Sequence, residues 1–561
     1  MRYLKNILMA VAGCVAFTSC EDALTEHPAS YYEKDDFFAD KANAEMGILG
    51  IYNVLPSLYG DNEMAFFVSD DTFFAAPGTS DNRRRDISAY TLTTSNVNVE
   101  AVWQYTYQGL DRANYMIQGI EAMEGYDRDE DLQSLVAEAK FLRAFFSFNL
   151  VKYWGDVPYK TTTTGNYEEA YLPRTPREEI YDQIVLDLTD AENGLEWADA
   201  GSSPERATQG AARALMMRVL LQRAGYSLQM DGTLQRPDDA LRQKYFKAVT
   251  KEWDAFAANG YHGFFEGGYE ELFKSFSAGT LDSKESLFEI AFYTPDGSTG
   301  ARGYWGTYNG PLVAAPAIDA TETDQFMGRA NALFRVVPEW RDFFDENDSV
   351  RRDVMVVTYR YNWDAEAHAH VKVDRPNDVR NFYPGKWRRE WMPIGYKDPN
   401  ITDVNYCCLR YADVVLMAAE AYNEIGETAK AWDLLNSVRR RAGAAEITSA
   451  NYAALLKSPK VYDLPFIDDG DEAGRFRTAL YWERGFELAF EGQRRYDLVR
   501  WGILGESLKM TGDNTRANTA GSTKSFVAGD NFQTGKHELF PIPLDEMQVN
   551  YRLENRNNPN Y

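Results

Sequence analysis

The sequence contains few of the residues from which disulfide-rich folds and metal sites are built. Only 4 of its 561 residues are Cys and only 5 are His. Two cysteines, Cys14 and Cys20, lie near the N-terminus, and the other two are the adjacent pair Cys407 and Cys408. So few cysteines cannot supply a disulfide framework. We expect Cys407 and Cys408 to be buried thiols, because free cysteine is among the most buried residue types; a strained vicinal disulfide is the alternative.

Positive charge is also scarce. The chain has 59 basic and 85 acidic residues, a net charge of −26. Nucleic acid and anionic lipid surfaces require a basic footprint, so neither is an expected partner. Motifs of common enzyme classes are missing too, namely G-x-S-x-G, the Walker phosphate loop and H-E-x-x-H. Glycoside hydrolysis needs only two carboxylates, so the acidic residues leave that one enzyme class open.

Long apolar runs are absent after the N-terminus. There, two basic residues precede an almost wholly apolar run over 7–17, which ends just before Cys20. The run is shorter than the roughly 20 residues of a membrane-spanning helix. Its order of basic, apolar and small residues predicts a secretory signal over residues 1–19, and the cysteine at the junction predicts lipidation of Cys20. Cys14 also follows small and apolar residues, but the apolar run continues past it, so we favour Cys20.

Apolar residues recur at helical spacing in the C-terminal third. Ala412, Val415, Ala419 and Tyr422 fall on one face of a helix, and the next segment repeats the pattern. Gly426 is placed to end the first helix in a left-handed cap. The two-helix unit over 411–441 resembles a tetratricopeptide repeat. We expect three further pairs, at about 130–153 with 176–195, 207–228 with 242–258, and 475–491 with 494–502.

Three stretches lack this regularity and are rich in glycine and aromatic residues, at about 56–110, 260–400 and 503–536. Long loops inside a compact domain are usually functional or disordered. Within the third stretch, residues 512–536 are polar and glycine-rich, so we expect a mobile surface insertion there. The other two are expected to be ordered.

An ordered series of short motifs runs through the chain. The N-terminal part contains EAKFLRAFF at 138–146 and LVKYWGDVP at 150–158; the C-terminal part contains RYAD at 410–413, LNSVRRRAG at 435–443, ERGFELAFEGQRRYDLVRW at 483–501, FPIP at 540–543 and NPNY at 558–561. In this order the set resembles the SusD/RagB family of surface nutrient-binding lipoproteins from Bacteroidetes. Gly485 stands where a second basic residue is usual, and Asn560 where glycine is usual. Both positions belong to scaffold motifs.

The resemblance covers nearly the whole mature chain and implies its architecture. The expected fold is mostly α, a superhelix of four tetratricopeptide-like helix pairs carrying a loop-rich, irregular half. It also implies a single body over 20–561, in which an N-terminal part (about 20–330) and a C-terminal part (about 331–561) interleave.

The resemblance further implies a function without catalysis. Members of the family capture a glycan, or sometimes a peptide, and pass it to a SusC/RagA-like TonB-dependent transporter in the same outer membrane. Glu21 and Asp22 after the lipid cysteine resemble a surface-export signal. No cofactor is implied. The acidic turn at 468–472 suits calcium by composition but fails the EF-hand spacing, so we favour a solvated loop.

Candidate ligand contacts lie in the irregular stretches. Sugar binding requires aromatic faces for the ring and carboxylate, amide and guanidinium groups for its hydroxyls. The candidates are Asp71, Asn82, Arg83, Tyr304, Trp305, Tyr308, Trp363 and Trp391. Trp305 lies between a tyrosine and Gly306 in a glycine-rich loop, so we expect it to be an exposed platform, with Tyr304 or Tyr308 beside it.

Other functions remain open to sequence reasoning. The same fold could bind a peptide or glycopeptide, in which case exposed rings would matter less than polar loops. A secreted glycoside hydrolase and a structural surface protein without a ligand are further alternatives. The sequence does not specify the sugar, its linkage or its length.

Overall fold

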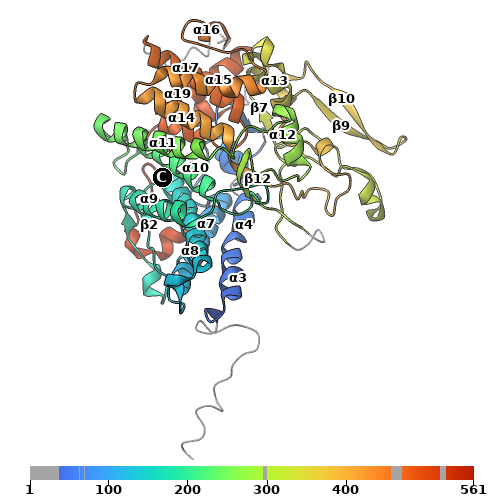
Figure 1. The fold of residues 1–561 in the computed structure, drawn as a ribbon. Coiled ribbons are helices and arrows are strands. Elements are labelled where there is room, and N and C mark those ends of the chain that lie inside the picture. The colour runs from blue at the N-terminus through green and yellow to red at the C-terminus, as the bar shows by residue number, and fades with distance from the viewer. Residues whose placement is uncertain are drawn as a thin grey trace, which may run out of the picture.

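The computed structural model describes residues 37–61, 64–68, 70–76, 78–294, 300–455, 470–518 and 526–561. Helices dominate these residues, and the strands among them form only two-stranded antiparallel sheets. Figure 1 shows helix pairs stacked from α8 and α9 towards α14, α15 and α17, while the hairpin of β9 and β10 projects from the other side. The expected mostly α, tetratricopeptide-like fold is confirmed.

All four expected helix pairs are present. They are α8 (Glu130–Trp154) with α9 (Arg177–Gly194), α10 (Gln209–Ala224) with α11 (Asp239–Asn259), α14 (Tyr411–Glu424) with α15 (Thr428–Ala442), and α17 (Glu472–Leu488) with α18 (Arg494–Arg500). Consecutive pairs pack through α9 on α10, α11 on α14, and α14 on α17. The pairs therefore form one continuous stack.

Local sequence explains where these helices begin and end. The Asp129 side chain accepts hydrogen bonds from the backbone of residues 131 and 132 and so starts α8. At the other end, Gly155 has φ +72°, and a Cβ there would lie 2.6 Å from Arg177 Nη2. Gly426 has φ +88° just after α14, as its position in the sequence predicts.

Helix α7 (Val97–Glu121) was not expected over its first half, which we assigned to an irregular stretch. This assignment was wrong. Asn96 caps the helix, and its buried face packs on α8. Glycines obscured the pattern because they serve packing here: a Cβ on Gly109 would lie 2.3 Å from Phe146 Cζ, and one on Gly119 would lie 2.0 Å from Phe38 Cζ.

The remaining helices have between 4 and 15 residues. They are α3 (Lys41–Tyr52), α4 (Leu55–Tyr59), α5 (Met64–Phe67), α6 (Arg84–Ser88), α12 (Gly268–Ser277), α13 (Ser349–Met355), α16 (Tyr452–Leu455), α19 (Leu504–Asn518), α20 (Ala528–Asn531) and α21 (Leu544–Val549). Residues 519–525 of the predicted mobile insertion at 512–536 lie outside the described part of the chain, and its described ends are helical or buried. Helix α19 continues to Asn518, and Phe526 and Ala528 are buried. None of the described helices has the length and apolarity needed to cross a membrane.

Six strand pairs occur among the residues that the structure describes. They are β1 (Phe73–Ala75) with β7 (Phe334–Val336), β2 (Val157–Pro158) with β3 (Arg174–Thr175), β4 (Ser227–Leu228) with β5 (Leu234–Gln235), β6 (Ser286–Ile290) with β12 (Tyr406–Arg410), β8 (Val356–Val357) with β11 (Tyr383–Pro384), and β9 (Tyr359–Asp364) with β10 (Ala369–Asp374). Strand β12 leads directly into α14, so the β6–β12 pair joins the irregular half to the helix stack.

A buried ion network lies at this junction. Glu487 on α17 accepts hydrogen bonds from Arg410 Nη1 at 2.7 Å, from Arg351 Nη1 at 3.3 Å, and from Arg441. Burial alone would raise the pKa of Glu487, but Arg441, Arg410 and Arg351 outweigh it and hold the pKa at about 2. Two of the scaffold motifs, RYAD and ERGFELAFEG, therefore meet through charge pairs inside the protein.

Candidate ligand-binding site

The turn over residues 303–309 presents a pair of stacked tyrosines. The backbone nitrogens of Thr307 and Tyr308 donate to the Tyr304 carbonyl at 3.0 and 3.3 Å, which forms a helical turn. Residues four apart share one face of such a turn. The rings of Tyr304 and Tyr308 accordingly stack at 5.1 Å with 9° between their planes, and both are half-buried. This pair offers an aromatic face on the irregular half.

Trp305 is not the exposed platform that the sequence predicted. Its exposed fraction is 0%, and its ring stacks on Tyr406 at 4.5 Å and packs on Trp387 at 4.6 Å. The flanking glycines explain the difference. A Cβ on Gly303 would lie 2.6 Å from the Thr402 carbonyl oxygen, and one on Gly306 would lie 2.3 Å from the Met392 methyl. The glycines allow close backbone packing, and the tryptophan fills the core beneath the turn.

Arg83 lies near Tyr308, and Asn82 precedes it in the same loop. Burial raises the pKa of the Tyr308 hydroxyl, while the neighbouring charges of Arg84 and Arg83 lower it in part. Arg84 lies 4.7 Å over the Tyr308 ring and pairs with Asp61. Arg83 and Asn82 are exposed, and Asn82 adopts φ +49°.

The loop that carries these side chains is held by its own acidic residues. Asp81 accepts from the backbone nitrogens of Arg83 and Arg85 at 2.9 and 3.1 Å, and Asp86 accepts from that of Asn82 at 3.0 Å. The exposed donors therefore stand on a fixed backbone.

Asp71 does not join this group. It is buried at 1% exposure and receives two hydrogen bonds from Arg494, at 2.8 and 2.9 Å. Tyr481 and Ser507 also donate to it. Burial would raise the pKa of Asp71, but Arg494 and these hydrogen bonds hold it below its usual range. Asp71 is a structural carboxylate, and the expectation that it lies at the ligand face was wrong.

Trp363 lies on the projecting hairpin. It is half-buried and makes edge contacts with Phe326 at 5.2 Å, His368 at 5.3 Å and His370 at 5.2 Å. Backbone hydrogen bonds of 2.9 Å between Tyr361 and residues 312 and 314 tie this hairpin to the segment after the tyrosine turn.

Sequence reasoning missed two tyrosines of the same strand. Tyr359, Tyr361 and Trp363 alternate along β9, and successive side chains of a strand point to opposite faces, so these three share one face. Tyr359 receives a hydrogen bond of 3.1 Å from Arg388 Nη1, and Lys372 lies 3.8 Å over its ring. Burial raises the pKa of Tyr361 to about 12. The two-residue alternation was the signal that could have identified this stripe.

Trp391 is half-buried, with the Arg388 guanidinium 4.1 Å over its ring. Its neighbour Met392 contacts Gly306 of the tyrosine turn. Trp391 therefore lies between the tyrosine turn and strand β9. Its neighbour Met392 contacts the turn, and Arg388, which covers its ring, donates to Tyr359 on β9.

The remaining chemical expectations concern metals and thiols. No group of three or more metal-ligating side chains occurs among the described residues. Of the acidic turn at 468–472, the first two residues lie outside the described part, and Asp471 accepts from Gly474 N at 2.7 Å as the cap of α17. Cys407 and Cys408 are buried and form no disulfide, as predicted.

Comparison with known proteins identifies the family. A family profile described as the SusD family matches residues 333–561, and one described as starch-binding associating with outer membrane matches residues 49–221. The chain belongs to the SusD/RagB family. A SusD-like protein, P25 of Formosa agariphila, is 24% identical and covers 98% of this chain and 97% of its own length.

Solved structures of SusD proteins share the fold. A SusD homologue from Bacteroides thetaiotaomicron has a TM-score of 0.77 at 27% identity, covering 94% of this chain and 98% of its own. A laminarin-binding SusD-like protein has a TM-score of 0.63 at 23% identity, covering 93% and 100%. At that identity the second likeness shows the fold alone.

Proposed function

We propose that this SusD-family protein captures a glycan at the Tyr304–Tyr308 pair and does not transform it chemically. The stacked rings, with exposed Arg83 near them and exposed Asn82 next to Arg83 in the chain, carry the proposal. The rings supply a face for the apolar side of a sugar, and the guanidinium and amide supply hydrogen bonds to its hydroxyls. Trp391 and the stripe of Tyr361 and Trp363 would extend the surface to further sugar units.

Relatives support the choice of a glycan over a peptide. One structural neighbour is described as laminarin-binding, and another is surface glycan-binding protein A from Bacteroides fluxus. The proposed destination of the ligand is a SusC/RagA-like TonB-dependent transporter in the outer membrane. The second family description, association with the outer membrane, is consistent with this location.

Replacing both Tyr304 and Tyr308 by alanine is expected to weaken glycan binding at least about tenfold, from a starting Kd between about micromolar and millimolar. The loss follows because the double variant has no aromatic face for the sugar. Titration calorimetry against a polysaccharide panel measures the effect. Tyr551→Ala, which removes a tyrosine that is 69% exposed, is the matched control and should bind normally. Unchanged binding by the double variant would place the site elsewhere.

The proposed lipid anchor is tested separately. Cys20 lies outside the described residues, so the proposal rests on the sequence of the leader. Cys20→Ala is expected to release the protein from the membrane fraction, because lipidation supplies the attachment. Cys14→Ala should leave it bound. Fractionation and antibody labelling of intact cells report both results; a Cys20→Ala protein that stays in the membrane contradicts the assignment.

A further inference from the structure

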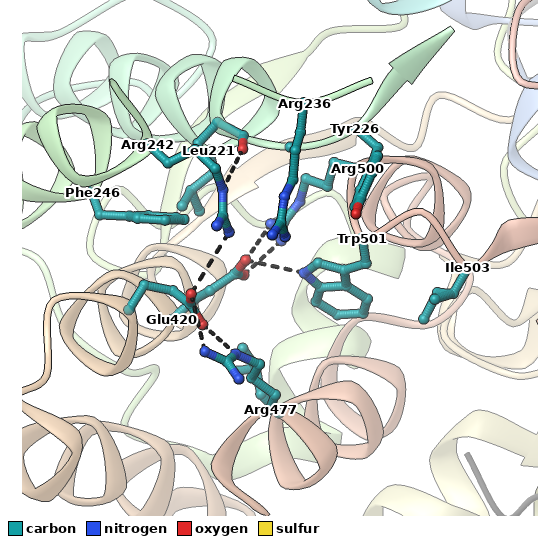
Figure 2. A pocket seen from close by; sticks show the side chains of 14 residues that line it. Leu221, Tyr226, Arg236, Arg242, Phe246, Glu420, Arg477, Arg500, Trp501 and Ile503 are labelled. Atoms are coloured by element: carbon teal, nitrogen blue, oxygen red, sulfur yellow. Dashed lines mark hydrogen bonds and ion pairs between the residues drawn. The ribbon is translucent and has the colours of Figure 1, made fainter. Parts of the chain in front are cut away.

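A cavity of about 290 Å³ lies in the helix stack, away from the tyrosine pair. Helices α10, α11, α14, α17 and α18 contribute to its wall, together with the segments that flank the β4–β5 hairpin. Its volume is near the lower end of the range for small-molecule pockets, about 300–1,000 Å³, and suits one ring-sized molecule. Figure 2 shows Arg236, Arg242, Arg477 and Arg500 among the side chains that line it around Glu420.

The first glutamate is fully paired. Glu420 is 6% exposed and accepts from Arg500 Nη2 at 2.7 Å and from the Trp501 indole at 3.0 Å. Arg500 also donates to Asp497 at 2.8 Å. Arg500 is therefore fully paired with carboxylates, and the Glu420 Oε2 atom, which accepts from Arg500 alone, can accept a further hydrogen bond from a hydroxyl group.

The second glutamate is paired as well. Glu424 accepts from Arg477 Nε at 2.6 Å, and Arg242 lies 3.8 Å from its other oxygen. Arg242 is further balanced by Asp239 at 3.3 Å. Two arginines and two carboxylates thus offset one another here.

Arg236 is the exception. The contact that the structure gives its guanidinium is with the Tyr226 ring, 5.2 Å away, and no carboxylate pairs with it among the described residues. Arg236 is exposed, and among the arginines that line the cavity it is the one whose guanidinium has no carboxylate partner in the described part of the chain. A guanidinium with free donors is suited to hold a carboxylate through two parallel hydrogen bonds.

The aromatic wall next to Arg236 is held in place. Tyr226 N donates to the Arg500 carbonyl at 2.7 Å, and Gly502, with φ +76°, lies against the ring. A Cβ at Gly502 would be 2.7 Å from Tyr226 Cδ2, so the close approach requires glycine. The Tyr226 hydroxyl has no hydrogen bond within the described part of the chain and remains available as a donor.

We propose that this cavity is a second ligand site, which binds a single sugar ring bearing one carboxylate, a hexuronic acid unit. Arg236 holds the carboxylate, Tyr226 and Trp501 contact the ring, and Glu420 and Glu424 accept hydrogen bonds from its hydroxyls. The site is distinct from the tyrosine pair and does not depend on the function proposed for that pair.

The test is titration of the full mature protein with sodium glucuronate, with glucose, acetate and sulfate as reference ligands. Glucuronate is expected to bind saturably and at least about tenfold more tightly than each reference, a difference of about 1.4 kcal/mol. Arg236→Gln should remove this preference. Arg128→Gln, which deletes an exposed arginine in the 3-10 helix η1 (Tyr126–Arg128), changes the net charge equally and should preserve it.

Three results overturn the proposal: glucuronate fails to bind, acetate or sulfate binds equally well, or Arg236→Gln and Arg128→Gln behave alike. An oligosaccharide with a terminal uronate, tested alongside, distinguishes a chain end from a free sugar acid as the source. Binding of neutral polysaccharide is expected to be unchanged in Arg236→Gln. A negative result for glucuronate binding at this cavity can therefore be told apart from a negative result for glycan binding at the tyrosine pair.

Discussion

Glu487→Ala is expected to lower the free energy of unfolding by about 3–5 kcal/mol, because Arg351, Arg410 and Arg441 each lose a carboxylate partner inside the protein. Denaturant unfolding followed by circular dichroism measures the change.

The matched control is Glu446→Ala. Glu446 pairs with Arg440 at the surface, where both side chains are more than half exposed, at 54% and 55%. Exposed pairs contribute little, so this variant should stay within about 1 kcal/mol of the parent. Equal effects of the two substitutions would show that the buried network does not stabilise the fold.

The same carboxylate gives the stability a pH dependence of defined sign. The folded pKa of Glu487 is about 2, below its ordinary value of 4.5. Its contribution is therefore complete above pH about 4.5 and is lost as the pH falls towards about 2, because the unfolded chain takes up the proton first. Glu487→Ala should lack this component of acid sensitivity, which unfolding measured across that range would detect.

Trp305→Ala is expected to lower the free energy of unfolding by about 3–5 kcal/mol, the usual cost of truncating a fully buried tryptophan. Its ring fills the space between Tyr406 and Trp387, and alanine would leave a cavity there. Thermal unfolding measures the loss, with Tyr308→Ala as a half-buried comparison from the same turn that should cost less. A Trp305→Ala protein of normal stability that no longer binds glycan would instead make Trp305 a ligand contact.

The helix stack was predictable because its signals are local. The spacing of small and apolar residues in α14, with Gly426 as the cap, depends on nothing outside the segment. Helix α7 was missed over its first half because its glycines permit close packing: Gly109 lies against Phe146 and Gly119 against Phe38. Both phenylalanines lie outside the helix. Glycine that permits close packing and glycine that permits a turn are indistinguishable without the partner.

The stretches that form the proposed site could be named from the sequence, but the exposure of their individual residues could not. The proximity of Arg83 to Tyr308 was expected from composition, because the irregular stretches at 56–110 and 260–400 both combine polar and aromatic residues. The exposure of Trp305 did not, because the turn that directs Tyr304 and Tyr308 outward directs the intervening tryptophan inward. Asp71 could be recognised as structural only once Arg494, distant in sequence, was placed against it.

The reactivity of the two thiols of β12 reports whether this strand is in place. Burial raises the pKa of Cys407 well above its ordinary value, so the thiolate that alkylating reagents attack is scarce while the strand is in place. In a variant with both Cys14 and Cys20 replaced, Cys407 and Cys408 are the only cysteines in the sequence. The rate at which a small thiol reagent modifies them then measures the opening of β12, the strand that joins the irregular half to the helix stack. No added probe is needed.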